Sequence, residues 1–132
     1  GASIIDNNSI LDFDMDIYAP CALGGILNTE SIDKLKCSIV CGGANNQLEN
    51  EERDSLHLKN RGIIFAPDFL VNSGGLINVY SEIKGYSKEI SLEKTKEIFN
   101  TTLDILNKSK AEGISSYIAA MNIAKERIQN NK

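Results

Sequence analysis

Residues 38–47 read SIVCGGANNQ, a short apolar run that passes directly into two glycines and two asparagines. The pattern recurs twice, because the run at 16–19 leads into Pro20 and the run at 62–66 leads into Pro67. Short apolar runs without strict alternation are typical of parallel strands that are covered on both faces. We therefore predict strands at 16–19, 38–41 and 62–66, and a further one at 3–5.

The segments between and after these strands carry helical patterns. Helices are predicted at 31–36 and at 50–60, the second with Asn50 as its N-cap. Past Pro67 the apolar spacing becomes helical to the end of the chain, with helices at 72–84 and 91–110. Gly113 is placed to end the second of these, and Ser115 or Ser116 to cap a last helix. Strands that alternate with helices predict an α/β fold with a parallel sheet and C-terminal helices, in one unit over 1–132 without an internal boundary.

Composition excludes several classes of function. The 132 residues are 42% hydrophobic and 24% charged, with a net charge of −4, which is the balance of a folded soluble protein. The chain lacks the basic stripe that nucleic acid requires and an apolar run of about 20 residues that would span a membrane. Its three cysteines and one histidine lack metal-ligand spacing, so we expect no metal site and a cytoplasmic location with reduced thiols.

Three segments follow directly on predicted strands, at 19–25, 42–47 and 66–75, and are rich in glycine, proline and amides. In open parallel sheets, ligands bind outside the carboxyl ends of the strands. Small residues there let a ligand approach the backbone closely. The carboxamides of Asn46 and Asn72 can pair with another carboxamide or with ribose hydroxyls. The alternative is that these segments are plain turns, in which the same residue types belong.

Two glycines, Gly74 and Gly75, begin a predicted helix, where each costs about 1 kcal/mol relative to alanine. This cost indicates a close approach by another group. Leu76 and Val79 lie three residues apart on one face of that helix and could form the wall of an apolar pocket, or simply pack in the core. Nucleophilic catalysis by Cys21 is not supported, since no histidine lies near it in the sequence. His57 is expected to face solvent.

Four stretches carry a resemblance to a known family: 16–25 (DIYAPCALGG), 44–48 (ANNQL), 65–69 (FAPDF) and 72–79 (NSGGLINV). They resemble the glutamate, leucine, phenylalanine and valine dehydrogenases in the same order and at similar spacing. The match continues through 117–120 (YIAA) and 124–128 (AKERI), which look like the end of the leucine dehydrogenase branch. The chain is thus most similar to the carboxyl-terminal part of a leucine dehydrogenase.

The resemblance implies a function and a set of site residues. The family oxidatively deaminates an L-amino acid to its 2-oxo acid and ammonium and passes a hydride to NAD, which is held on a Rossmann domain. It implies five coenzyme-binding residues: Ala19, Cys21, Ala22, Asn46 and Asn72. It also implies that Leu76 and Val79 face the substrate side chain. The glutamate-specific branch tends to place a serine at the position of Val79, so an apolar residue there favours a branched-chain substrate.

Other parts of the family pattern are missing from these residues. The GxGxxG turn that binds pyrophosphate, and the lysine and aspartate that catalyse the reaction, are not in the sequence. We therefore expect the carboxyl-terminal part of a Rossmann domain from a longer, homo-oligomeric enzyme, inactive alone. A decayed gene remnant that self-associates or binds a partner is the alternative. Phenylalanine or valine as substrate, and NADP in place of NAD, stay open.

Overall fold

The computed structural model describes residues 1–83 and 85–130, and it contains a small parallel sheet covered by helices. The strands are β1 (Ile17–Tyr18), β2 (Ile39–Val40) and β3 (Ile64–Phe65), in the spatial order β1-β2-β3 with all three parallel. Each lies inside a strand that the sequence predicts. The α/β class with C-terminal helices is therefore confirmed.

The two faces of the sheet differ in burial. Tyr18, Val40 and Phe65 lie on the buried face and pack into one core cluster with side chains of the helices that follow the strands. Ile17 and Ile64 lie on the other face and are 54% and 47% exposed. Alternate residues of a strand point to opposite faces, so this pattern places the helical cover of the sheet on one side.

The strand predicted at 3–5 is wrong. Residues 3–5 form no strand, and Ile4 is fully exposed. A short 3-10 helix, η1 (Ile10–Asp12), is the first element. Strands require a neighbour with which to exchange backbone hydrogen bonds, and among the described residues β1 has such a partner only in β2. Residues 3–5 are apolar enough for a strand, but no described strand pairs with them.

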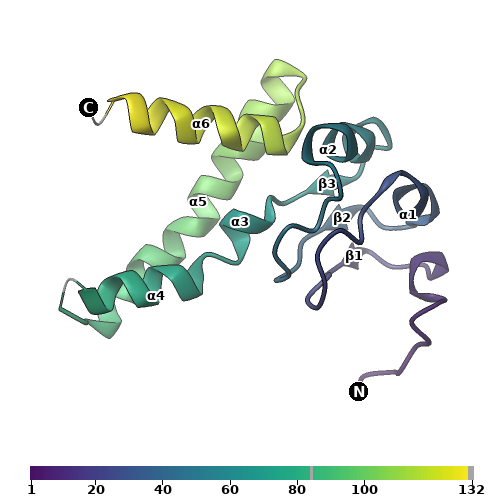
Figure 1. Ribbon diagram of the computed structural model, residues 1–132, viewed down its shortest axis with the longest axis horizontal. Coiled ribbons are helices and arrows are strands. Elements are labelled where there is room, and N and C mark those ends of the chain that lie inside the picture. The colour runs from purple at the N-terminus through teal and green to yellow at the C-terminus, as the bar shows by residue number, and fades with distance from the viewer. Residues whose placement is uncertain (84, 131–132) are drawn as a thin grey trace.

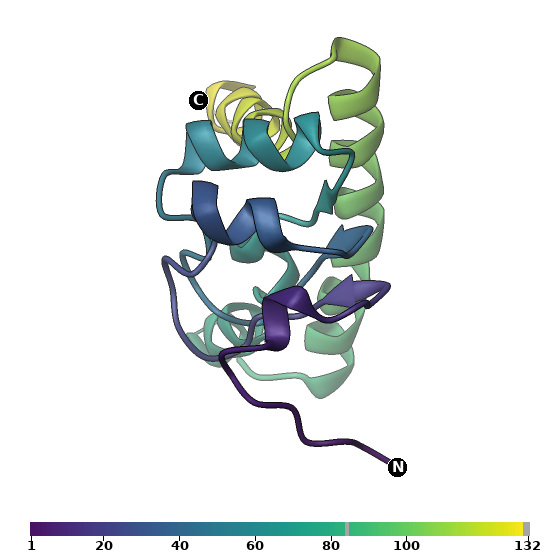
Figure 2. The ribbon, with the colours of Figure 1, turned by 90° about the vertical axis from the view of Figure 1, so that its right-hand side faces the viewer.

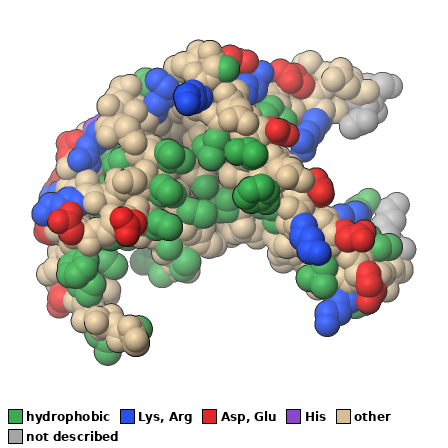
Figure 3. All heavy atoms as spheres, turned by 180° about the vertical axis from the view of Figure 1, so that it is seen from behind, with side chains coloured by type: hydrophobic (Ala, Val, Ile, Leu, Met, Phe, Trp, Pro, Cys, Tyr) green, Lys and Arg blue, Asp and Glu red, His purple; other side chains and the backbone are tan. Residues whose placement is uncertain are grey.

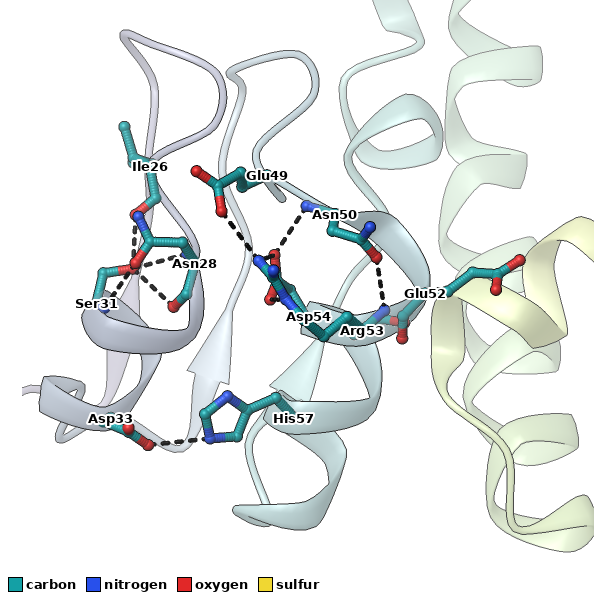
Figure 4. A network of polar contacts seen from close by, with 11 residues as sticks. Ile26, Asn28, Ser31, Asp33, Glu49, Asn50, Glu52, Arg53, Asp54 and His57 are labelled. Carbon is teal, nitrogen blue, oxygen red and sulfur yellow. Dashed lines mark hydrogen bonds and ion pairs between the residues drawn. The ribbon is translucent and has the colours of Figure 1, made fainter.

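The helices between the strands begin at well-formed caps (Figure 4). In α1 (Thr29–Lys34), Asn28 and Ser31 form a reciprocal capping box. In α2 (Glu51–Asn60), the Asn50 side chain accepts a hydrogen bond from the backbone N–H of Arg53, as predicted. The fully buried Asp54 carboxylate accepts from the Asn50 N–H and from the Arg53 guanidinium. These side chains satisfy backbone donors that a helix start leaves unpaired.

His57, which the sequence predicts to face solvent, is only partly exposed. Its side chain is 23% exposed, and its Nε2 lies 3.0 Å from the Asp33 carboxylate. This contact joins α2 to α1 (Figure 4). The helical spacing of α2 alone could not reveal it, because Asp33 belongs to a different helix.

In the part of the chain that the structure describes, four helices follow β3: α3 (Asp68–Val71), α4 (Gly74–Ile83), α5 (Lys88–Glu112) and α6 (Ser116–Asn130). The helix predicted at 72–84 begins at Gly74 in the structure, two residues later than predicted, because Asn72 is the C-cap of the separate short helix α3. Lys84, the last residue of the predicted helix, lies outside the described residues. Gly113 ends α5 with φ +67°, and the Ser115 hydroxyl accepts from the Ile118 N–H. Both end signals predicted for this turn are confirmed.

The helices are arranged so that α4 and α5 form an antiparallel hairpin extending away from the sheet (Figure 1). In Figure 2, η1, α1, α2 and α6 follow one another along one side of the molecule. A second, smaller core cluster of Ile105, Ala119 and Ala120 joins α5 to α6. Over the described residues, none of the helices combines the length and the apolar character needed to cross a bilayer.

Candidate functional site

The three segments predicted as a site lie together at the carboxyl edge of the sheet, because their strands are parallel neighbours. We call them the first loop (19–25), the second loop (42–47) and the third loop (66–75), the last of which contains the short helix α3. Two of them are in backbone contact. The Ala44 N–H donates to Pro20 O at 3.0 Å, and the Gly25 N–H donates to Asn46 O at 2.7 Å. The loop after β1 and the loop after β2 therefore form one layer.

Glycine is required within this layer for packing between loops. A Cβ at Gly42 would lie 2.1 Å from Pro20 O, and one at Gly24 would lie 2.8 Å from Asn45 O. Both distances are below any real carbon contact, so a side chain at either position would force the loops apart. The sequence pattern suggests that such glycines admit a ligand, but at these two positions it is protein backbone that approaches.

Cys21 lies on the exposed surface of the first loop, and its Sγ accepts a hydrogen bond from the Gly43 N–H at 3.3 Å. Ala19 and Ala22 are also exposed on this loop. Small or uncharged side chains thus line this part of the sheet edge. Among the described residues, the Gly43 N–H is the hydrogen-bond partner of the Cys21 sulfur, and no base that could activate a cysteine nucleophile is bonded to it.

Asn72 connects the third loop to the second. Its Nδ2 donates to Asn45 Oδ1 at 2.5 Å and lies 3.4 Å from Gly43 O. Asn45 is a site residue that the sequence prediction does not include, since the prediction names only its neighbour Asn46. The doubled asparagine at 45–46 was the available signal. With Nδ2 engaged in this way, no described residue donates to Asn72 Oδ1, and this oxygen can accept from a ligand.

Asn46 is exposed and has φ +51°, in the left-handed region that non-glycine residues seldom occupy. Its backbone carbonyl is held by the Gly25 N–H, while its carboxamide makes no hydrogen bond to the described residues. The structure therefore brings Cys21, Asn46 and Asn72 to one edge around Gly43 and Asn45. The carboxamides at this edge offer both donors and acceptors.

Leu76 and Val79 lie on α4 and are 72% and 57% exposed, so neither packs in the core of the described chain. Gly75 precedes them in the first turn, and a Cβ built there would have no atom within 4 Å. The start of α4 thus presents an open backbone surface next to two apolar side chains. Figure 3 shows the molecule from behind as an arch, with hydrophobic side chains gathered in the hollowed region.

A cavity of about 340 Å³ lies behind the second loop, between it, α3 and α6. It is lined by Asn45, Asn46 and Asp68, among others, and by Tyr117, whose ring meets Phe69 edge-on at a centroid distance of 6.1 Å. Burial raises the pKa of the Tyr117 phenol, and nearby carboxylates raise it further. Tyr117 therefore stays neutral near pH 7 and cannot act there as a base.

Comparison with known proteins now places the chain in a family. The family model described as Glutamate/Leucine/Phenylalanine/Valine dehydrogenase matches residues 1–131. This chain belongs to that family. The resemblance seen in the sequence is confirmed.

Among the relatives, an L-tryptophan dehydrogenase of Nostoc punctiforme is 46% identical over 132 residues, covering 100% of this chain and 37% of that protein. A leucine dehydrogenase of Thermoactinomyces intermedius is also 46% identical, covering 98% of this chain and 35% of that protein. The crystal structure of the Nostoc L-tryptophan dehydrogenase matches with a TM-score of 0.95 at 45% identity, covering 98% of this chain and 39% of that one. The chain therefore spans little more than a third of the length of these relatives.

Proposed function

We propose that these residues form the carboxyl-terminal part of the NAD-binding Rossmann domain of an amino-acid dehydrogenase, where they hold the nicotinamide end of the coenzyme and contact the substrate side chain. The observation that carries the proposal is that the Asn46 carboxamide and the Oδ1 of Asn72, neither of which bonds to a described residue, both lie at the carboxyl edge of a parallel sheet. Ligands of open parallel sheets bind at this edge. The family assignment supplies the reaction class.

The donor set fits the nicotinamide and ribose half of the coenzyme. Asn72 Oδ1 can accept from the amide of a nicotinamide carboxamide, because Asn45 holds Nδ2 on the opposite side. The exposed Asn46 carboxamide can meet ribose hydroxyls. The small surfaces of Ala19, Cys21 and Ala22 would leave room for the planar ring. When bound, NAD supplies a hydride acceptor for the substrate carbon.

Leu76 and Val79 support an apolar substrate. In a closed enzyme, a side-chain carboxylate against these two residues would lose its water without gaining a partner, which costs several kcal/mol. We therefore propose a branched-chain amino acid as substrate and place glutamate last. An aromatic substrate is the second candidate, because an L-tryptophan dehydrogenase is as similar to this chain as a leucine dehydrogenase is.

The exposed apolar surface supports the proposal that the active enzyme is longer. Ile17 and Ile64 are register partners of Ile39, so the three form one row across the outer face of the sheet. Exposed apolar surface of this kind usually marks an interface. In the proposal, the pyrophosphate-binding turn and the catalytic lysine and aspartate lie in the rest of a homo-oligomeric enzyme, and this chain alone is inactive.

Activity of the longer enzyme tests the proposal. Reduced coenzyme would be followed with L-leucine, L-valine, L-phenylalanine, L-tryptophan and L-glutamate, each with NAD and with NADP. We expect turnover with NAD and an order that places L-leucine or L-valine first and L-glutamate last. A preference for L-tryptophan would select the second candidate, and absence of turnover with every amino acid would refute the proposal.

A matched pair of variants tests the role of the pocket wall. Val79→Ala should lower kcat/KM for the preferred apolar amino acid by about tenfold, as expected for apolar groups removed from a substrate pocket. Leu92→Ala, at a 52% exposed position on α5, serves as the control. Equal effects of the two substitutions would show that Val79 does not contact substrate.

A further inference from the structure

Gln47 and Asp68 are buried beneath the loops whose exposed residues form the candidate site. Gln47 is fully buried, and Asp68 is 8% exposed. Neither side chain belongs to the two hydrophobic clusters. Burial of polar side chains is costly unless hydrogen bonds compensate the loss of water. The partners that these two side chains have are all backbone groups of the segments that form the site, and Gln47 Oε1 has no partner among the described residues.

Gln47 holds the second loop from within. Its Nε2 donates to Gly42 O at 2.8 Å and to Ala44 O at 2.9 Å, so one carboxamide group fixes both ends of the turn that leads to Asn45 and Asn46. Its own backbone carbonyl accepts from the Leu27 N–H at 3.0 Å, which joins this loop to the segment after β1. The shape of the loop therefore depends on one buried side chain.

Asp68 fixes the third loop to the second. Its Oδ2 accepts from the Gln47 N–H at 2.9 Å, and its Oδ1 accepts from the Phe69 N–H at 2.8 Å. Charge-assisted hydrogen bonds of this kind are shorter and stronger than neutral ones. Four residues later along the chain, Asn72 meets Asn45. Asp68 and Asn72 thus form two bonds between the same loops, one buried and one at the surface.

We propose that Gln47 and Asp68 are positioning residues that set the placement of the Asn46 and Asn72 carboxamides, and through them the orientation of the nicotinamide ring. The inference rests on the proposed function for its catalytic part only. The hydrogen bonds of Gln47 and Asp68 that connect the loops, which we call the brace, are a property of this chain. Small displacements of a positioned group are costly to catalysis, since about 1 Å can lower a rate by about a hundredfold.

Asp68→Asn is the decisive variant, and Asp54→Asn is its matched control. Asparagine at 68 keeps one acceptor oxygen, so either the Gln47 or the Phe69 N–H must face an NH2 group. Asp54 is also a buried aspartate that accepts a backbone N–H, from Asn50, but its contacts, including its ion pair with Arg53, lie only at the start of α2. Both variants lose a buried charge, while only the first should change the site loops.

The first measurement is nuclear magnetic resonance on the 132-residue chain, without coenzyme. In Asp68→Asn, we expect the Gln47 amide to exchange with solvent about tenfold faster, and the Asn45 and Asn72 side-chain resonances to shift. In Asp54→Asn these signals should stay unchanged. Equal behaviour of the two variants would overturn the brace. If Asp68→Asn does not fold, Gln47→Glu takes its place, because it removes the two donations of Nε2 and should shift the same resonances.

The second measurement is steady-state kinetics of the longer enzyme. Asp68→Asn should lower kcat by about ten- to a hundredfold and raise KM for NAD, while Asp54→Asn leaves both within about twofold. An equal loss of kcat in the two variants would show that Asp68 has only a structural role. A wild-type enzyme without NAD-linked turnover would refute the proposed function, and the resonance experiment would still decide the brace.

Discussion

Gly75→Ala separates the demands of the fold from those of a ligand at the start of α4. Within the described chain nothing requires glycine here, because an added Cβ would have no atom within 4 Å and φ is not in the left-handed region. Alanine at a compatible position stabilises by about 0.4–1 kcal/mol, chiefly because it restricts the unfolded chain. For a chain of 132 residues this corresponds to a rise in Tm of about 1.5–3.5 °C.

Gly74→Ala is the matched control. A Cβ at Gly74 would lie 3.7 Å from the Thr95 Cγ2, which is an ordinary contact with α5 and places this position against the protein. Both variants of the 132-residue chain should therefore melt at a higher temperature than wild type, as followed by circular dichroism. In the longer enzyme, Gly75→Ala alone should lower kcat/KM, by about tenfold or more, because its methyl group would occupy the space we assign to coenzyme or substrate.

The two readouts refute different steps. A lower Tm for Gly75→Ala would show that the open space at this position is not real. A higher Tm with unchanged kcat/KM would show that no ligand approaches the start of α4. Equal losses of activity in the two variants would mean that α4 itself, and not the surface at Gly75, has been disturbed.

Three further predictions concern the chain alone. Iodoacetamide should modify the exposed Cys21 much faster than the buried Cys37. Burial raises the pKa of the Cys37 thiol, so less of it is thiolate at pH 8. Peptide mass spectrometry measures both rates, and comparable rates in the folded chain would contradict the burial of Cys37. Gly113→Ala should cost about 1–2 kcal/mol in urea unfolding, because φ is +67° at this position; a neutral effect would contradict the left-handed end of α5. Asn50→Ala should cost about 1 kcal/mol through the lost cap of α2, and Asn50→Asp, which keeps the acceptor, should restore most of it.

The sheet and the helix ends could be predicted because their signals are local. Each strand lies within an apolar run that is closed by proline or glycine, and Gly113 and Asn50 mark a helix end and a helix start by their own backbone preferences. The segment at 3–5 shows the limit of such signals. Its composition is that of a strand, but a strand exists only with a partner, and none of the described residues provides one there.

The site was predictable only to the level of its loops. Parallel strands bring three loops to one edge, and this follows from topology once the strands are assigned. The contact of Asn72 with Asn45 spans 27 residues, and the hydrogen bond from Gln47 to Asp68 spans 21. No periodicity reports contacts over such distances.

The same limit applies to the glycines, whose purpose depends on what lies opposite them. The sequence treats Gly42 and Gly75 alike, as positions that permit a close approach. In the structure, Gly42 is closed off by the backbone of Pro20, while Gly75 faces open space. A glycine closed off by its own protein is explained by the fold, so substitution there should damage stability and activity together. A glycine that faces open space in a helix has no such explanation within the described chain. If the proposed ligand approaches Gly75, substitution there should change stability and activity in opposite directions, and this result would separate it from Gly42.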